Sequence, residues 1–240
     1  MTPRKAVLRI VAGLSLVVSF WTRAAGQTPD TAGEFWPILD VHTQLSSNLR
    51  LLVFGGLKKG EEFPYQQVDV GAGLGYRLKP ILRTHSVNID PEKEHHLTFG
   101  GGYGHLRTIQ SGKPKYENRL ALEATFRYRP PAGFLLEDRN RVEFRWVNGQ
   151  YSTRYRNRLT VQRDLGVGQF RFTPYASAEA FYHGPSHSWK EEQYAAGVEW
   201  PYKRLLRLQT YYLRQNCTTC SPAHLNVAGL TLSLFFRSRT

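Results

Sequence analysis

The segment YENRLALEATFRY, residues 116–128, alternates charged and apolar side chains with a period of two. Glu117, Arg119 and Glu123 occupy one set of alternate positions, and Leu120 and Leu122 belong to the other. Successive residues of a β-strand point to opposite faces of the sheet. The segment is therefore predicted to be a strand with one charged face and one apolar face.

The same alternation continues to residue 165. A Pro-Pro-Ala-Gly turn at 130–133 and an Asn148-Gly149 pair, which is typical of tight hairpins, divide the stretch into three predicted strands. In a membrane barrel such strands place their apolar residues against lipid and their charged residues in the lumen. The residues that we expect to line the lumen are Glu117, Arg119, Glu123, Arg127, Glu137, Arg139, Arg141, Glu143, Arg145, Arg154, Arg156, Arg158 and Asp164.

A soluble β-protein would turn the charged face to water, and for one hairpin that alternative is the simpler one. Here nearly the whole chain repeats the pattern, and no amphipathic helix is available to cover the apolar face. Further strands are predicted at 35–44, 49–57, 65–78, 96–109, 169–182, 193–202, 205–215 and 225–236.

These segments and the three charged strands give eleven predicted strands, whereas single-chain bacterial barrels have an even number. Either a further strand lies within 81–87, or the first two segments form one strand across Ser46 to Asn48. We therefore expect an all-β, antiparallel transmembrane barrel of the outer membrane with ten to twelve strands, twelve being favoured.

The start of the chain has the features of a secretory signal. Basic residues precede the apolar run from Ile10 to Phe20, and small residues follow at Ala24 to Gly26. The run is shorter than the roughly 20 residues that a membrane-spanning helix needs. We predict a signal peptide at 1–26, which implies export and a location in the outer membrane of a diderm bacterium. Residues 27–240 are predicted to form a single barrel domain.

The charge of the chain is strongly basic. Of its 32 basic and 19 acidic residues, four basic ones lie within 1–26, so 28 would remain beside the 19 acids. The arginines alternate with apolar residues along predicted strands and do not cluster on a helix or in a tail. This distribution, together with export, argues against nucleic acid as a partner. It favours a cationic lumen, small anionic solutes and contact with outer-membrane lipids.

Aromatic residues near strand ends fit the two interfacial girdles of a membrane barrel, although β-proteins are rich in aromatics in general. The residues in question are Trp36, Tyr65, Tyr76, Tyr116, Tyr128, Trp146, Tyr151, Tyr182, Trp189, Trp200 and Tyr202. The final predicted strand has alternate apolar residues from Ala228 to Phe236, an aromatic close to the end of the sequence. It resembles the terminal strand of outer-membrane proteins, which the barrel assembly machinery reads; here Arg237 to Thr240 follow the aromatic.

The segments around Glu117-Asn118-Arg119-Leu120, Arg139 to Trp146 and Tyr155 to Leu159, together with the closing strand, support a family resemblance. They resemble the bacterial outer-membrane barrel family catalogued as domain of unknown function 2490. The resemblance covers most of residues 27–240 and is strongest from Tyr116 onward. It implies an outer-membrane β-barrel, and it implies neither a reaction nor catalytic residues.

Cys217 and Cys220 form the only cysteine pair of the sequence, before the last predicted strand. A CxxC pair can be a redox centre, half of a metal site or a structural disulfide. A redox pair normally opens a helix, which nothing here predicts, and zinc would need two more ligands besides the candidate His224. In an oxidising compartment we expect a disulfide.

One predicted loop contains the residue types of a hydrolase. It holds His183, Ser186, His187 and Ser188, followed by Glu191 and Glu192, so nucleophile, base and orienting group are all represented. These are also ordinary residues of a polar loop, and no Gly-x-Ser-x-Gly turn frames a serine. His95 and His96, with Glu92 and Glu94, offer a weak metal site by composition. We assign no catalytic residue, no metal and no cofactor.

Three functions remain open at this point. The first is a non-enzymatic outer-membrane barrel with an Arg/Glu-lined lumen, such as a narrow pore. The second is an outer-membrane lipid-modifying hydrolase or acyltransferase that uses the loop at 183–188. The third is a soluble periplasmic β-protein that binds a ligand. Only the third would place apolar residues inside the barrel and charge outside.

Overall fold

The computed structural model describes residues 30–60, 65–78, 91–110, 113–130, 133–168, 170–203 and 205–237. The signal peptide predicted at 1–26 and the strand considered at 81–87 lie outside these residues. No helix in the described ranges is long and apolar enough to cross a membrane.

The described chain is all-β, as predicted. Its strands are β1 (Thr31–Gln44), β2 (Leu49–Gly60), β3 (Tyr65–Arg77), β4 (Leu97–Gln110), β5 (Lys113–Tyr128), β6 (Phe134–Val147), β7 (Gln150–Arg163), β8 (Leu165–Val167), β9 (Phe170–His183), β10 (Ser188–Tyr202), β11 (Leu206–Cys217) and β12 (His224–Arg237). Two short 3-10 turns, η2 (Pro91–Glu94) and η3 (Gly184–Ser186), lie in connections.

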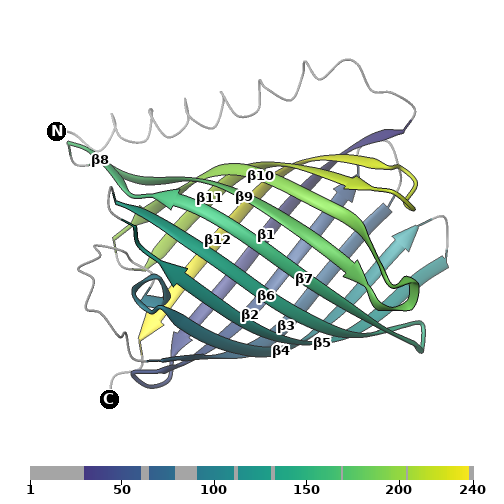
Figure 1. Ribbon diagram of the computed structural model, residues 1–240, viewed down its shortest axis with the longest axis horizontal. Helices are drawn as coiled ribbons and strands as arrows, with labels where there is room; N and C mark the ends of the chain where they lie inside the picture. The colour runs from purple at the N-terminus through teal and green to yellow at the C-terminus, as the bar shows by residue number, and fades with distance from the viewer. Residues whose placement is uncertain are drawn as a thin grey trace.

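All described strands except β8 join into one closed wall (Figure 1). Each wall strand corresponds to one of the eleven segments predicted from the sequence, and the three-residue β8 pairs only with the start of β9. β1 and β2 are separate strands joined at residues 45–48, so the alternative of a single long first strand is wrong.

An odd number of wall strands closes through one parallel seam. β1 pairs with β12 in parallel, with Thr31 opposite His224 and Gln44 opposite Arg237, whereas the other described wall pairs are antiparallel. When the direction alternates along an odd series of strands, the first and last strands run the same way. The wall therefore departs from the expected even number of strands, and the parallel pairing of β1 with β12 allows an odd number to close.

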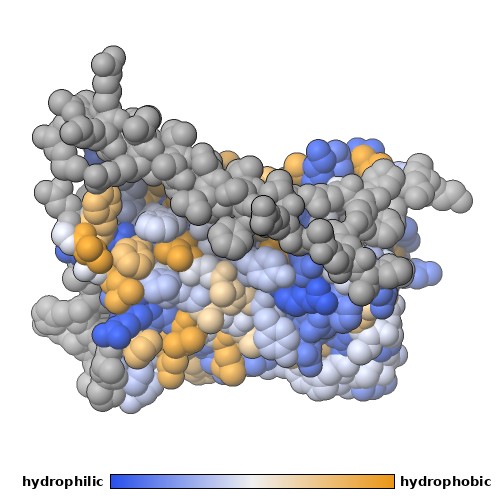
Figure 2. All heavy atoms as spheres, turned by 90° about the horizontal axis from the view of Figure 1, so that it is seen from above, coloured by the Kyte–Doolittle hydropathy of each residue, from blue (hydrophilic) through white to orange (hydrophobic). Residues whose placement is uncertain are grey.

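The two faces of the wall have inverted polarity relative to a soluble protein. In the isolated molecule Glu143 is fully buried and Glu179 is 4% exposed, whereas Leu122 and Leu159 are 52% and 57% exposed. A single-layer closed wall has one inner and one outer surface, so the charged residues face inward and the apolar residues outward. Over the face shown in Figure 2, hydrophobic residues cover much of the wall toward one end of the view.

Exposed aromatic residues mark both ends of the wall. We call the end that holds the Asn148-Gly149 turn the Asn148 end, and the opposite end, near η2, the Lys93 end. The exposed aromatics at the Asn148 end are Tyr116, Trp146, Tyr151 and Trp189; those at the Lys93 end are Tyr76, Tyr128, Trp200 and Tyr202. Trp36 departs from the prediction, since it faces inward and is buried. Two aromatic belts around an apolar wall are the arrangement of transmembrane barrels.

Candidate functional site

The most concentrated chemistry of the molecule lies on the inner faces of β5, β6, β7 and β9, where arginines and glutamates form a dense set of ion pairs. Glu143 of β6 is its first centre. Arg154 Nη2 lies 2.7 Å from Glu143 Oε2 and Arg156 Nη1 lies 3.0 Å from Glu143 Oε1. Arg119 and Arg141 approach the same carboxylate at 3.8 and 3.9 Å. Four guanidinium groups therefore surround one fully buried carboxylate.

Glu179 of β9 is the second centre. Its carboxylate pairs with Arg139 at 2.9 Å, Arg156 at 2.9 Å and Arg158 at 2.6 Å. Arg156 thus joins both centres, and Arg139 reaches Glu179 over the intervening strand β7. The inner surface here is cross-linked by charge over four wall strands, which keeps the buried charges paired.

Three further glutamates complete the set. Glu117 pairs with Arg119 at 2.8 Å and with Arg145 at 2.7 Å. Glu123 lies 3.0 Å from Arg141, and Glu137 lies 2.6 Å from Arg127. In this set of described ion pairs eight arginines (Arg119, Arg127, Arg139, Arg141, Arg145, Arg154, Arg156 and Arg158) face five glutamates (Glu117, Glu123, Glu137, Glu143 and Glu179), an excess of three positive charges.

The structure brings together twelve of the thirteen residues predicted to line the lumen. The thirteenth, Asp164, follows the end of β7 and is exposed, where its Oδ1 accepts a hydrogen bond of 2.7 Å from the Thr173 hydroxyl. The sequence prediction missed Glu179, although this residue lies on the polar side of its strand. The alternation of polar and apolar residues around Glu179 is visible in the sequence. The proximity of Glu179 to Arg139, however, depends on the register of β6, β7 and β9.

The inner surface of β9 to β12 and β1 is filled by rings. Tyr175, Gly197, Tyr211, Gly229 and Trp36 are successive neighbours across five strands, a set that we call the aromatic–glycine row. A Cβ atom at Gly229 would overlap the ring of Tyr211, so the glycine leaves the space that the ring occupies. Trp36 also packs in a buried apolar cluster with Leu213 and Val227.

At the Lys93 end of the lumen, one side chain of η2 reaches the inner face of the wall. Lys93 is buried, and its Nζ lies 2.6 Å from Gln162 Oε1 of β7 and 2.7 Å from Glu199 Oε2 of β10. The Arg129 guanidinium donates to the Lys93 carbonyl. No feature of the sequence indicated this contact, because residues 79–94 were considered only as a loop or a hidden strand.

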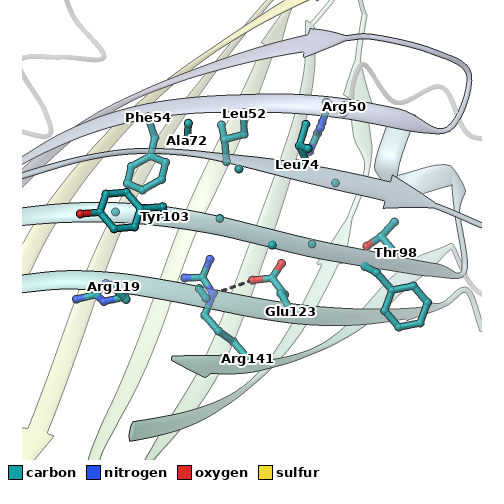
Figure 3. A pocket seen from close by; sticks show the side chains of 18 of the residues that line it. Arg50, Leu52, Phe54, Ala72, Leu74, Thr98, Tyr103, Arg119, Glu123 and Arg141 are labelled. Atoms are coloured by element: carbon teal, nitrogen blue, oxygen red, sulfur yellow. Dashed lines mark ion pairs between the residues drawn. The ribbon is translucent and has the colours of Figure 1, made fainter. Parts of the chain in front are cut away.

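A cavity of about 160 Å³ lies beside the ion pairs, on the inner side of β2 to β6 (Figure 3). The inward positions of β3 and β4 here are glycines, namely Gly73, Gly75, Gly100, Gly102 and Gly104. Arg50, Leu52 and Phe54 line it from β2, and Arg119, Glu123 and Arg141 from β5 and β6. These glycines leave an open space opposite the charged residues of β5 and β6.

The loop that carries hydrolase-type residues is arranged differently from a catalytic triad. The Ser188 hydroxyl donates to Ser186 Oγ at 3.1 Å, and the Ser186 hydroxyl donates to the His183 carbonyl at 3.4 Å. His183 Nε2 lies 3.9 Å from Glu191. None of the hydrogen bonds described for the two serines involves a histidine ring.

The cysteine pair lies in the connection between β11 and β12 at the Asn148 end. Cys217 and Cys220 are joined by a disulfide, and Cys217 itself is buried. His224 is not grouped with these sulfurs: its Nδ1 contacts Asn216 Oδ1 at 2.9 Å. In the described ranges no three His, Cys, Asp or Glu residues are placed to hold a metal ion.

Comparisons with known proteins identify a matching family and several similar solved structures. A family model described as "Protein of unknown function (DUF2490)" matches residues 33–224, as the sequence resemblance predicted. No curated protein matches the chain. Among solved structures, the beta domain of the Bordetella autotransporter Brka is similar at 14% identity and a TM-score of 0.47, covering 73% of this chain and 80% of that one. The translocator domain of the autotransporter NalP from Neisseria meningitidis is similar at 10% identity and a TM-score of 0.47, covering 75% and 71%.

Proposed function

The chain belongs to the DUF2490 family, and we propose that it is a non-enzymatic barrel of the bacterial outer membrane whose lumen offers small anionic solutes a narrow path. The observation that carries this proposal is the excess of arginine over glutamate in the inward-facing ion pairs. Fixed positive charges on the walls of a confined, poorly hydrated space raise the local concentration of anions.

The location in the outer membrane is supported by the outer surface of the wall. Within the part of the chain that the structure describes, no layer covers its large apolar side chains, and aromatic residues bound them at both ends. A closed barrel is one of the two backbone arrangements that satisfy all hydrogen bonds in lipid. The apolar wall would contact outer-membrane lipids, and the outward row Ala228, Leu230, Leu232, Leu234 and Phe236 of β12 would present the signal read by the assembly machinery.

The path is narrow because side chains occupy most of the lumen. The aromatic–glycine row fills one side, the paired arginines and glutamates fill another, and Lys93 occupies one mouth. Passage would follow the remaining cavity along β3 and β4. The arrangement of Ser186, Ser188 and His183 supports the non-enzymatic part of the proposal.

The proposal is tested by conductance of the refolded protein in a planar bilayer, with reversal potentials measured under a salt gradient. We expect small, anion-selective steps. Arg158→Gln removes a lumen charge and should lower the ratio of anion to cation permeability. Arg107→Gln is the matched control, because Arg107 is exposed and lies on the outward side of β4.

Two results would contradict the proposal. One is cation-selective or unselective conductance of the wild-type protein. The other is an equal loss of anion selectivity in Arg158→Gln and Arg107→Gln, since the lumen charge would then have no special role. A protein that stays soluble without detergent and fails to insert would overturn the membrane location itself.

A further inference from the structure

The cavity beside the glycines of β3 and β4 results from a row of small residues that crosses several strands. Leu52, Gly73, Gly102 and Ala121 are successive neighbours across β2 to β5, so four strands present only one large side chain to the lumen at this level. The next neighbour of Ala121 is Glu143 of the ion-pair set. The cavity therefore lies directly beside the ion-pair set.

The walls of this cavity carry both signs of charge. Arg50, Arg119, Arg141 and Glu123 line it (Figure 3). Asp69 lines it as well, which leaves one excess positive charge. The side chains of Arg141 and Glu123 are 29% and 25% exposed, whereas that of Glu143 is fully buried. Because these groups are on the inner wall, their exposure is to the cavity.

Two kinds of hydrogen-bonding capacity remain unused there. Asp69 is partly exposed on the inner face of β3, and its Oδ1 makes no hydrogen bond to a described residue, although a carboxylate oxygen is a strong acceptor. Arg141 Nε and Glu123 Oε2 lie 3.0 Å apart as an ion pair, yet neither atom makes a hydrogen bond. The Asp69 carboxylate leans toward Gly104, where a Cβ would lie 3.6 Å from Oδ1. The Asp69 carboxylate and the partly exposed Arg141 guanidinium thus line the same small space.

We propose that this cavity binds a protonated phosphate, either inorganic phosphate or the phosphate group of a small monoester. Its anionic oxygens would accept hydrogen bonds from the arginines, for which guanidinium geometry is suited. Its P–OH group would donate to the Asp69 carboxylate. This inference rests on the proposed function. It names the class of anion that would use the path, and its site lies in the same lumen.

Asp69 gives the site a means of discriminating between oxyanions. A carboxylate cannot donate, so it accepts a proton-bearing oxygen and repels one that bears none. Inorganic phosphate retains a proton at neutral pH, whereas sulfate has none to give. A buried donor or acceptor left unmatched costs a factor of roughly ten to a hundred in binding, so phosphate should be preferred over sulfate by about that factor.

The test is equilibrium dialysis of the refolded full chain in detergent with radiolabelled inorganic phosphate, and with unlabelled sulfate or methyl phosphate as competitors. The pH is held at about 6, where about half of a phosphate monoester still carries a proton on its phosphate group. We expect saturable binding of one phosphate, and competition by sulfate only at roughly ten to a hundred times higher concentration. Methyl phosphate distinguishes the two sources: if it competes as well as phosphate does, the site accepts monoesters, and if it does not, free phosphate is the ligand.

Two variants make the result specific. In Asp69→Asn the amide can present a donor or an acceptor, so the preference for phosphate should collapse as sulfate binding improves. Glu137→Gln is the control, because it makes the same kind of change in a lumen residue that does not line the cavity. Electrophoretic mobility of the unheated protein verifies that both variants are folded.

The proposal is overturned if the folded wild-type protein shows no saturable phosphate binding, or if sulfate competes as well as phosphate does. It is also overturned if Glu137→Gln loses the preference as fully as Asp69→Asn. Dialysis requires no conduction, so these outcomes are independent of the bilayer measurement. Phosphate binding without conductance would refute the anion path but not the phosphate site. Anion conductance without phosphate binding would refute the phosphate site but not the anion path.

Discussion

Lys93 Nζ lies 2.7 Å from Glu199 Oε2, and this ion pair holds η2 against a wall strand more than a hundred residues away in the sequence. The same ammonium group donates to Gln162 on β7, so it joins two strands that are separated by β9. Both partners are inward-facing residues near the Lys93 end. One side chain therefore orients the turn that carries it, and we expect it to close this mouth of the lumen.

The first prediction concerns this closure. Lys93→Met keeps the apolar part of the side chain but removes the ammonium group, and Glu199 remains near Arg207 at 3.6 Å. We expect single-channel conductance in a planar bilayer to rise above the wild-type value, because η2 loses both anchors. Lys203→Met, at an exposed lysine in the turn after β10, should leave conductance unchanged. Equal conductance of Lys93→Met and wild type would show that Lys93 does not close the path.

The second prediction concerns the buried centre at Glu143. Glu143→Gln removes the buried counter-charge of Arg154 and one of the two carboxylates that pair with Arg156, so the free energy of unfolding should fall by about 3–5 kcal/mol. Glu137→Gln, at a partly exposed carboxylate with one arginine partner, should cost only about 1 kcal/mol. Guanidinium unfolding of the protein in lipid vesicles measures both values. Similar losses in the two variants would contradict the central role of Glu143.

The third prediction concerns the aromatic–glycine row. Gly229→Ala forces a methyl group into the Tyr211 ring, and overpacking of this kind costs about 1–3 kcal/mol. Gly55→Ala is the matched control, since nothing lies within 4 Å of the position of its Cβ, and it should change stability by less than about 0.5 kcal/mol.

A double-mutant cycle with Tyr211→Ala identifies the cause of the Gly229 effect. In the Tyr211→Ala background the space under the ring is empty, so adding the Gly229 methyl group should no longer destabilise the protein. If the penalty of Gly229→Ala persisted in that background, its origin would be the backbone and not contact with the ring.

Much of the wall was predictable because alternation is a local property of the sequence. The eleven wall strands and the inward direction of Arg119, Glu143 and Arg156 follow from a period of two. The parallel pairing of β1 and β12 does not, since the pattern of side chains carries no information on which strands become neighbours at closure. The rule that single-chain barrels have an even number of strands therefore predicts a count that the wall does not have.

The site was less predictable than the wall because its contacts depend on three-dimensional register. Glu179 meets Arg139 across 40 residues of sequence, and Lys93 meets Glu199 across 106. Lys93 also lies in an irregular segment, where no periodicity indicates which side chain turns inward. The cavity depends on glycines, whose meaning in a strand is ambiguous until the opposite wall is known.

The last prediction concerns the outer surface, where an introduced arginine affects stability differently in a membrane barrel and in a soluble barrel. Leu122 is half exposed on the outward side of β5, about midway along the strand. In water an exposed leucine can be replaced by arginine with little change in stability. In lipid, arginine near the middle of the bilayer costs about 2–4 kcal/mol, and the cost falls toward the interface. Leu122→Arg should therefore lower the unfolding free energy in vesicles by this amount. Val167→Arg, in the exposed β8 beyond the wall, should have almost no effect, and equal costs at the two positions would mean that the apolar face of β5 does not meet lipid.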